Sequence, residues 1–198
     1  MRFVWTVAGD DPDIGNCKAH GVDGYFAPLF DSLTTSAYLR MLRDQGGGAY
    51  GLYLGHDWFP GDSAEQLAQR VNAEYVRLNV LGTRVMFNLE EHDPDKIARV
   101  LEEWRRLQPK VNTSWSPEGM QGGWMDSVFV ARVLACRVRV VPQAFVGNMA
   151  RRESDVVLRD VTRRGFPEGV VSIFYDAAQL GADWDGYAFT EGRLPRII

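Results

Sequence analysis

The chain has 198 residues, 45% hydrophobic and 24% charged, which is enough for one well-buried core and too few for two full-sized domains. A single domain over residues 1–198 is therefore expected. The formal net charge of -4 argues against a general nucleic-acid binder, which would need clustered Lys and Arg on its surface.

The first nine residues have the pattern of a strand, and they lack the long apolar core and the small-residue cleavage site of a secretory signal. No run in the sequence reaches the roughly 20 apolar residues that span a bilayer. We therefore expect a protein made in the cytoplasm without a signal peptide and without a membrane partner. Cys17 and Cys136 are too few for a disulfide framework and match no metal-ligand spacing, so both are interpreted as free thiols.

Short β-rich runs recur along the chain, and most are followed by a turn and a helical pattern. Strands are predicted at residues 3–8, 24–27, 49–54, 83–89, 110–115, 138–145, 170–175 and 186–189. Helices are predicted at residues 32–44, 63–78, 93–107, 126–135 and 154–164, with a shorter one at 177–180. The clearest helix start is Asp93 as N-cap with Pro94 at the first helical position. Ser63 and Gln66 predict a capping box at the start of the helix at residues 63–78.

Alternation of strands and helices favours parallel strands, because parallel neighbours need a crossover connection and a helix is the usual one. Eight predicted strands suggest closure into a barrel. A full (β/α)8 barrel usually needs about 250 residues, so the predicted fold is a compact (β/α)8 TIM-like barrel with shortened or missing helices. An open doubly wound sheet is the alternative. No Gly-rich phosphate loop follows the first strand to favour it.

The strand at residues 83–89 runs directly into acidic residues and a helix start. Side chains alternate with period two along a strand, so Asn88 and Glu90 share one face with Met86. We expect this face to point into the barrel. Because the carboxyl ends of parallel strands are where sites are built, Asn88 and Glu90 are candidate site residues.

Acids and aromatic residues dominate the predicted carboxyl ends of the strands. Acids hydrogen-bond sugar hydroxyls, aromatic faces stack on sugar rings, and glycoside hydrolysis needs a proton-donating carboxyl beside a second carboxylate or a positioned water. The candidate catalytic residues are Glu90, Asp10 and Asp176, and the candidate substrate-binding residues are Asn88, Asp57, Trp58, Trp115, Glu118, Gln143 and Tyr175. The loop at residues 115–124 is expected to line the same mouth as Glu90.

Other chemistries are less well supplied. His56 and His92 each precede an Asp, but two such pairs on separate loops are a weak metal signal, and neither a metal nor a cofactor is expected. Ser114 and Ser116 lack the Gly-x-Ser-x-Gly elbow of a serine hydrolase. Cys17 and His20 lack a recognisable third group that would orient a catalytic thiol. Among the tryptophans, Trp104 is predicted to lie in the core.

The order of elements, the segment Asn88-Leu89-Glu90 and the closing segment at residues 185–195 resemble the family 25 glycoside hydrolases, which are lysozyme-like barrels that cleave peptidoglycan. The fourth strand of that family ends in Asp-x-Glu, whose Glu is the catalytic acid. The resemblance therefore implies that Glu90 is the acid and that Asp10 is the acid of the first strand. It also implies a cell-wall polysaccharide as the binding partner.

Asn88 departs from this family pattern, because it stands where the family has Asp. An amide can neither act as a general base nor supply negative charge to an oxocarbenium-like transition state, and losing that charge lowers the pKa expected for Glu90. Barrels of this type also occur in bacteriophage tails. We therefore expect a virion-associated barrel that holds cell-wall glycan or other phage tail subunits with degenerate catalysis. The alternative is an active muramidase-like hydrolase using Glu90 as general acid.

Overall fold

The structure is a computed structural model in which residues 2–5, 24–29, 40, 44, 49–54, 59–78, 84–89, 93–117, 125–144, 154–172, 174–176 and 187–190 are described. Its strands are β1 (Arg2–Trp5), β2 (Gly24–Pro28), β3 (Ala49–Leu54), β4 (Arg84–Phe87), β5 (Thr113–Trp115), β6 (Arg139–Val140), β7 (Gln143–Ala144), β8 (Phe174–Asp176) and β9 (Tyr187–Thr190). Its helices are α3 (Ala64–Arg77), α4 (Pro94–Leu107), α5 (Ser127–Ala135), α6 (Ser154–Arg163) and the 3-10 turn η2 (Glu168–Val170).

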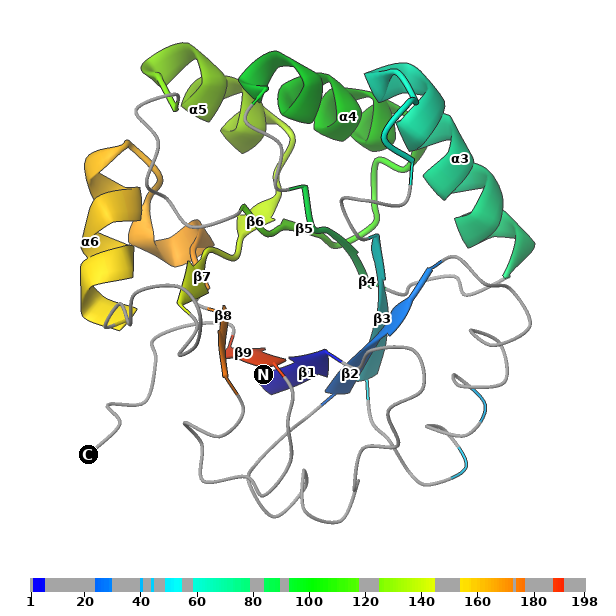
Figure 1. The fold of residues 1–198 in the computed structure, drawn as a ribbon, viewed down its shortest axis with the longest axis horizontal. Helices are drawn as coiled ribbons and strands as arrows, with labels where there is room; N and C mark the ends of the chain where they lie inside the picture. The colour runs from blue at the N-terminus through cyan, green and yellow to red at the C-terminus, as the bar shows by residue number, and fades with distance from the viewer. Residues whose placement is uncertain are drawn as a thin grey trace.

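The strands form one mixed sheet in the order β6-β5-β4-β3-β2-β1-β9-β8-β7. The two strands at the ends of this order, β6 and β7, are separated in the chain only by Val141 and Pro142. Val140 also forms a parallel bridge with Val171, and the backbone N–H of Ser172 donates to the Val140 carbonyl at 2.8 Å. The strands consequently follow a barrel-like ring, with helices α3, α4, α5 and α6 on its outside (Figure 1).

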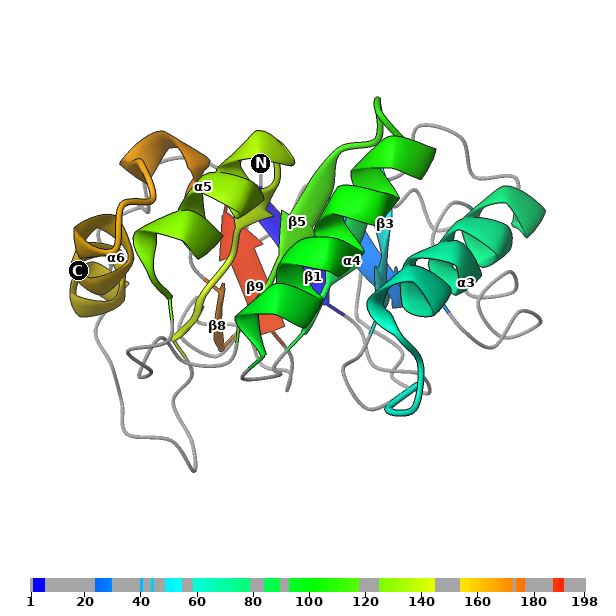
Figure 2. The ribbon, with the colours of Figure 1, turned by 90° about the horizontal axis from the view of Figure 1, so that it is seen from above.

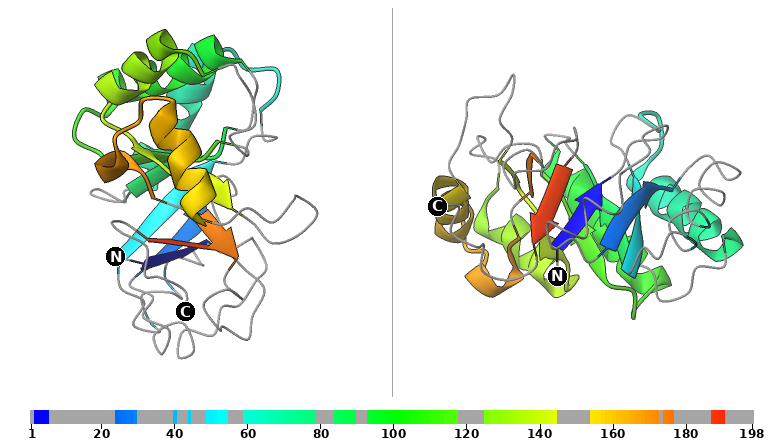
Figure 3. Two further views of the ribbon diagram at one scale, coloured as in Figure 1. Left: turned by 90° about the vertical axis from the view of Figure 1, so that its left-hand side faces the viewer. Right: turned by 90° about the horizontal axis from the view of Figure 1, so that it is seen from below.

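The last strand, β9, corrects the expectation of an all-parallel sheet. It pairs antiparallel with both β1 and β8, whereas β1 to β6 pair parallel in sequence order. Only residues 177–186 connect β8 to β9, and a parallel crossover needs a dozen or more residues. The connection is therefore too short for a parallel crossover, and β9 lies antiparallel between β8 and β1 (Figure 3).

Two other predicted strands are shorter than expected. The strand predicted at residues 138–145 is interrupted at Pro142, which has no backbone N–H to donate to a ladder, so its halves become β6 and β7. The strand predicted at residues 170–175 begins only at Phe174, because residues 168–170 form the turn η2. Of the helix predicted at residues 32–44, only Arg40 and Asp44 are described, both in helical conformation, and the one predicted at residues 177–180 lies outside the described residues.

The helix starts follow the local sequence signals. Ser63 and Gln66 form the predicted capping box at the start of α3, with the Gln66 N–H donating to the Ser63 hydroxyl at 3.2 Å. Asp93 caps α4, and Pro94 occupies its first turn. Asp126 caps α5 by accepting a 2.8 Å hydrogen bond from the Phe129 N–H. Helices α3, α4 and α5 then pack side by side (Figure 2).

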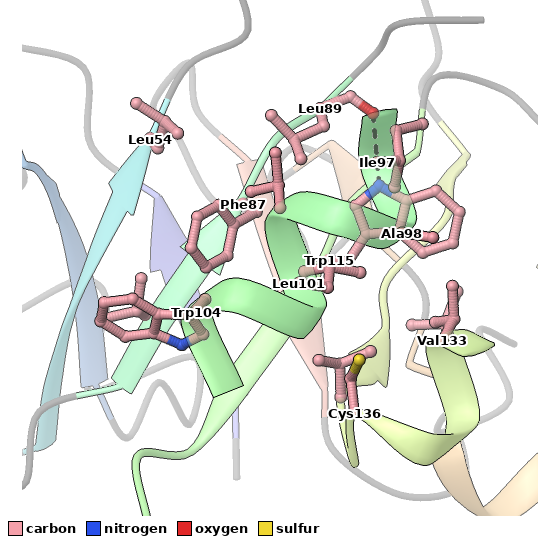
Figure 4. Packing of buried hydrophobic residues seen from close by; sticks show 14 of the residues in the cluster. Leu54, Phe87, Leu89, Ile97, Ala98, Leu101, Trp104, Trp115, Val133 and Cys136 are labelled. Carbon is pink, nitrogen blue, oxygen red and sulfur yellow. Dashed lines mark hydrogen bonds between the residues drawn. The ribbon is translucent and has the colours of Figure 1, made fainter. Parts of the chain in front are cut away.

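The hydrophobic core lies between these helices and the sheet. Trp104 of α4 is fully buried, as predicted, and its ring makes edge contacts with Phe87 at 5.5 Å and Tyr75 at 5.7 Å. Its indole N–H donates to the Thr113 hydroxyl at 2.8 Å, which satisfies the one polar atom of the ring. Figure 4 shows Phe87 and Leu89 turned toward α4 in this layer. The alternating residue Met86, also fully buried, therefore lies on the opposite, inner face of β4.

Cys136, which follows α5, is a free thiol buried in the same core. Burial raises the pKa of this thiol to about 11, so it stays protonated and unreactive at neutral pH. Cys17 lies outside the described residues. Within the described part of the chain, no helix is both long enough and apolar enough to cross a membrane.

Candidate functional site

Backbone hydrogen bonds carry the parallel ladder one residue beyond the end of β4. The Asn88 N–H donates to the Leu54 carbonyl at 2.9 Å, and the Ser116 N–H donates to the Phe87 carbonyl at 2.8 Å. Asn88 and Ser116 are therefore held by the sheet at the carboxyl ends of β4 and β5. We call this end of the ring, defined by Asn88 and Ser116, the carboxyl-end mouth.

The pleat directs Asn88 and Ser116 to the inner face of the sheet. Phe87 is in register with Trp115, so the two residues that follow them are neighbours on adjacent strands. Phe87 and Trp115 both join the helix-facing core, which leaves the inner face to the residues on either side. Asn88 is 7% exposed and Ser116 is fully buried. The structure thus places Asn88 inward, as the alternation predicts, and adds a buried hydroxyl beside it.

Leu89, the residue directly before Glu90, is held by Trp115. The Trp115 indole N–H donates to the Leu89 carbonyl at 3.3 Å, and the Leu89 side chain is buried in the helix-facing core (Figure 4). The backbone at the start of the predicted catalytic segment is therefore fixed by a core residue. Glu90 itself lies outside the described residues.

The prediction that Trp115 forms part of a ligand surface is wrong. Its side chain is fully buried, and its ring lies at 5.5 Å and 78° from the ring of Phe129 and at 6.4 Å from that of Phe166. Trp115 alternates with Ser114 and Ser116 along β5, so its position on the strand directs it into the helix-facing core. Trp115 therefore packs between the sheet and the helices, and its side chain contributes no surface to the carboxyl-end mouth.

Ser114 and Ser116 are the inner residues that sequence reasoning missed. Both are buried, and Ser114 is in register with Met86 on β4. The signal that identifies them is the pattern Ser-Trp-Ser at a strand end, which predicts two small polar groups on one face. The hydroxyls of Ser114 and Ser116 and the Asn88 amide consequently lie on the inner face of β4 and β5, and of these Asn88 and Ser116 lie at its carboxyl end.

The remaining candidates fall into two groups. Gln143, Tyr175 and Asp176 lie in β7 and β8, where Ala144 pairs with Tyr175 and Asp176 pairs with Tyr187 of β9. The structure therefore brings the backbones of these three residues into neighbouring strands of the ring. The other predicted site residues, Asp10, Asp57, Trp58, Glu90 and Glu118, lie outside the described residues, as do residues 118–124 of the loop expected at the mouth.

Among the described residues, no group of three or more His, Cys, Asp or Glu side chains could hold a metal ion. His56, Asp57 and His92 of the weak metal signal lie outside these residues. The chemistry offered by the described part of the mouth is hydrogen bonding by amide and hydroxyl groups. Such groups orient a polyhydroxylated ligand through donors and acceptors of both kinds.

Comparison with known proteins identifies the fold. No protein-family model and no curated protein matches the sequence. Catalytic-site mutants of the active domain 2 of chitinase from Pyrococcus furiosus are similar in structure, with a TM-score of 0.58 and 18% identity over 85% of this chain and 68% of that chain. The same domain complexed with chito-oligosaccharides gives a TM-score of 0.57 at the same identity and coverage.

The carboxyl transferase domain of Rhizobium etli pyruvate carboxylase, bound to pyruvate, is also similar, with a TM-score of 0.52 and 9% identity over 78% of this chain and 28% of that chain. A glycosidase domain and a carboxyl transferase domain share no chemistry, so these similarities report architecture. The chain has a mixed α/β fold similar to TIM-barrel-like glycoside hydrolase domains.

Proposed function

We propose that this protein is a glycoside-hydrolase-like barrel that binds a cell-wall glycan at its carboxyl-end mouth, with degenerate catalysis. The observation that carries the proposal is the position of Asn88 at the inner carboxyl end of β4, directly before Leu89 and Glu90. The chitinase similarity supports a glycan as the ligand class. The ligand we propose is a β-linked glycan rich in N-acetylated sugars, the chemistry shared by chito-oligosaccharides and peptidoglycan.

The fold we propose in full is a compact (β/α)8-type barrel with missing helices and a reversed last strand. The segment at residues 139–144 supports closure, because its first half pairs with β5 and its second half with β8. Closure brings the carboxyl ends of β4 and β8 to one rim, where Asp176 and Glu90 could act on one ligand. The mouth would then hold the sugar between strands from both halves of the chain.

Loss of charge at Asn88 is the reason to propose binding without efficient cleavage. A general acid must be protonated near neutral pH, which needs an apolar pocket or a neighbouring negative charge to raise its pKa. Asn88 supplies no charge, and the neighbouring Ser116 supplies only a hydroxyl. An amide and a hydroxyl hydrogen-bond a sugar equally well before and after cleavage, and uniform binding of this kind does not accelerate the chemical step.

Calorimetric titration tests the binding step. We expect the purified protein to bind chitotetraose or soluble peptidoglycan fragments and to give no heat with maltotetraose, whose α-linked glucose units lack N-acetyl groups. Asn88→Ala should weaken this binding about 10-fold, the order expected for one lost hydrogen bond. Val128→Ser, on the exposed face of α5, is the matched control and should bind as the parent does. Absence of binding to both N-acetylated glycans refutes the proposed ligand class.

A gain-of-function variant tests the catalytic step. Asn88→Asp recreates the Asp-x-Glu ending of family 25 glycoside hydrolases, and we expect it to release reducing ends from cell-wall glycan at least 10-fold faster than the parent. Adding Glu90→Gln to this variant should remove the gain. Turnover by the parent protein that is abolished by Glu90→Gln alone would establish the second candidate, an active muramidase-like hydrolase assisted by Asp10, Asp57 or Asp176.

The setting we propose is a bacteriophage virion at the host cell wall, with other tail subunits as partners. It is supported by the resemblance to family 25 barrels, which also occur in tail machinery. Mass spectrometry of purified virions from a lysate that contains the protein tests this setting, because a structural subunit must co-purify with assembled tails. Recovery of the protein only in the free fraction contradicts the virion role and leaves the glycan-binding proposal intact.

A further inference from the structure

A cavity of about 450 Å³ opens at the end of the ring opposite the carboxyl-end mouth. Arg84, which lines it, is the first residue of β4, whereas Asn88 follows the last residue of that strand. We call this the amino-end cavity; it is lined by Arg84, Asn112, Thr113, Ser114, Leu134, Arg137, Val138, Arg139 and Val170. Asn112 and Arg137 are exposed, so the cavity is open to solvent. Its size lies within the range of about 300 to 1,000 Å³ that holds small molecules.

The charge of this lining is entirely positive among the described residues. Three arginines, Arg84, Arg137 and Arg139, come from the starts of β4 and β6 and from the end of α5, and no acid is among the lining residues. Asn112 and Ser114 add an amide and a hydroxyl. Three guanidiniums with two neutral hydrogen-bonding groups form a set of donors suited to an oxyanion.

Arg84 and Arg139 are half-buried, which makes their charges costly to place here. Burial lowers the pKa of both guanidiniums, and the charge of Arg139 lowers the pKa of Arg84 further. The Arg139 guanidinium donates to the Ser172 hydroxyl at 3.2 Å. Both side chains also interact with other groups of the chain, and five N–H donors per guanidinium allow them to do so and still bind an anion. A bound anion would relieve the repulsion between them.

Arg137 occupies a position that usually belongs to glycine. It follows the C-cap residue of α5 with φ of 53°, in the left-handed region, whereas Gly165, with φ of 101°, takes the corresponding place after α6. Arg105 fixes this segment by donating to the carbonyls of Cys136 at 2.7 Å and Arg137 at 3.3 Å. Strained residues that persist in a rigid setting tend to mark functional sites, and Arg137 is one of the residues that line the cavity.

We propose that the amino-end cavity is a binding site for a small phosphate-bearing molecule, held by Arg84, Arg137 and Arg139. The planar guanidinium pairs with phosphate oxygens through two parallel hydrogen bonds, and several such forks can share one phosphate group. The volume of the cavity is larger than that of a bare phosphate ion, so the remaining space would hold a small organic group such as a sugar. This site is separate from the proposed glycan site at the other end of the strands.

Titration with inorganic phosphate and with glucose 6-phosphate tests this proposal, with ionic strength held constant by sodium chloride. We expect both to bind and to raise the melting temperature, with glucose 6-phosphate binding more tightly, and glucose alone to do neither. Arg137→Asn removes one guanidinium and keeps a residue type that tolerates positive φ, so the fold should survive. It should weaken binding of both phosphates at least 10-fold while leaving binding of chitotetraose unchanged.

Arg163→Gln removes an exposed charge from α6, outside the cavity, and is the matched control that should bind phosphate as the parent does. Arginine side-chain N–H signals in NMR spectra give a readout independent of stability, and those of Arg84 and Arg139 should shift on addition of phosphate. Equal effects of chloride and phosphate, or unchanged phosphate affinity in Arg137→Asn, overturn the proposal. Loss of phosphate binding with intact glycan binding would leave the proposed function standing.

Discussion

The indole N–H of Trp115 donates a hydrogen bond to the carbonyl of Leu89 at 3.3 Å, which couples the end of β5 to the residue directly before Glu90. Both side chains are buried in the layer between the sheet and the helices. A core residue therefore fixes the backbone of Leu89, the last described residue before Glu90. Trp115 serves the candidate site through the backbone, although it cannot touch a ligand.

Replacement of this indole tests the relationship. Trp115→Phe removes the donor and leaves the Leu89 carbonyl without it, and it also leaves a space beside Phe129. We expect a loss of about 2 to 4 kcal/mol in the free energy of unfolding, measured by urea denaturation, from the lost hydrogen bond and the cavity together. Glycan affinity should fall as well, because the end of β4 is no longer fixed.

Trp104→Phe is the matched control for this variant. Its indole N–H bonds to Thr113 at the start of β5, so the change should also lower stability but should spare glycan affinity. A Trp115→Phe protein of unchanged stability and reduced glycan affinity would restore the interpretation of Trp115 as a ligand surface.

Gly51 of β3 allows the fully buried ring of Phe26 to lie against its backbone. A Cβ atom at Gly51 would approach the Phe26 ring to 2.5 Å, which is closer than real Cβ contacts come. We expect Gly51→Ala to lower the free energy of unfolding by about 1 to 3 kcal/mol through overpacking. Gly169→Ala is the control, because a Cβ there meets nothing within 4 Å. A double-mutant cycle with Phe26→Leu should recover part of the loss, and strict additivity would show that the ring is not the obstacle.

An ion-pair cluster between α4 and α5 predicts a specific dependence of stability on pH. Arg132 donates to Asp95 at 2.7 Å and to Glu102 at 2.7 Å, and these hydrogen bonds lower the pKa of both carboxyls below their ordinary values near 4. A lowered folded-state pKa contributes stability above the unfolded-state pKa, and that contribution is lost as the pH falls through the folded-state pKa.

Arg132→Gln should therefore reduce stability at pH 7 and flatten the decline of stability below about pH 5, where the parent loses this contribution. The reduction should be modest, because the partners are largely exposed and solvent screens them. Urea unfolding midpoints between pH 7 and pH 3 give the comparison, with Arg163→Gln, an exposed position on α6, as the surface control. If the unfolding midpoints of Arg132→Gln and the parent changed with pH in parallel, Arg132 would not be the group that lowers the pKa of Asp95 and Glu102.

Local sequence signals predicted the helix starts well, because their causes lie within four residues. The side chains of Ser63, Asp93 and Asp126 each bond to a backbone N–H two or three residues on, so the cap and its partner appear together in the sequence. The inward face of β4 was likewise predictable, because alternation along one strand is a local property.

Features that depend on distant segments were harder to predict. Trp115 is buried by Phe129 and Phe166, which come from other elements, and nothing next to Trp115 in the sequence distinguishes it from an exposed aromatic. Arg84 of the amino-end cavity lies far in the sequence from Arg137 and Arg139, and the parallel order β4-β5-β6 brings it to the same end of the ring. The reversal of β9 was predictable in principle, since its connection to β8 is too short for a crossover helix.

Asn88→Asp, the variant that recreates the family 25 ending, also carries a stability prediction. The site is 7% exposed, so a carboxylate there loses most of its hydration, and burial should raise its pKa above the ordinary value near 4. An acid with a raised folded-state pKa does not lower the free energy of unfolding at pH values below its unfolded-state pKa. It lowers that free energy progressively as the pH rises toward and through the folded-state pKa. We therefore expect the free energy of unfolding of the variant to be about 1 to 3 kcal/mol lower than that of the parent at pH 7, and the difference to be much smaller near pH 4.

Urea denaturation at both pH values, with Asn88→Ala as the uncharged control, separates this effect from the loss of the amide. A pH-independent deficit in Asn88→Asp would contradict this prediction and would mean that the inner face of β4 is hydrated enough to hold a carboxylate.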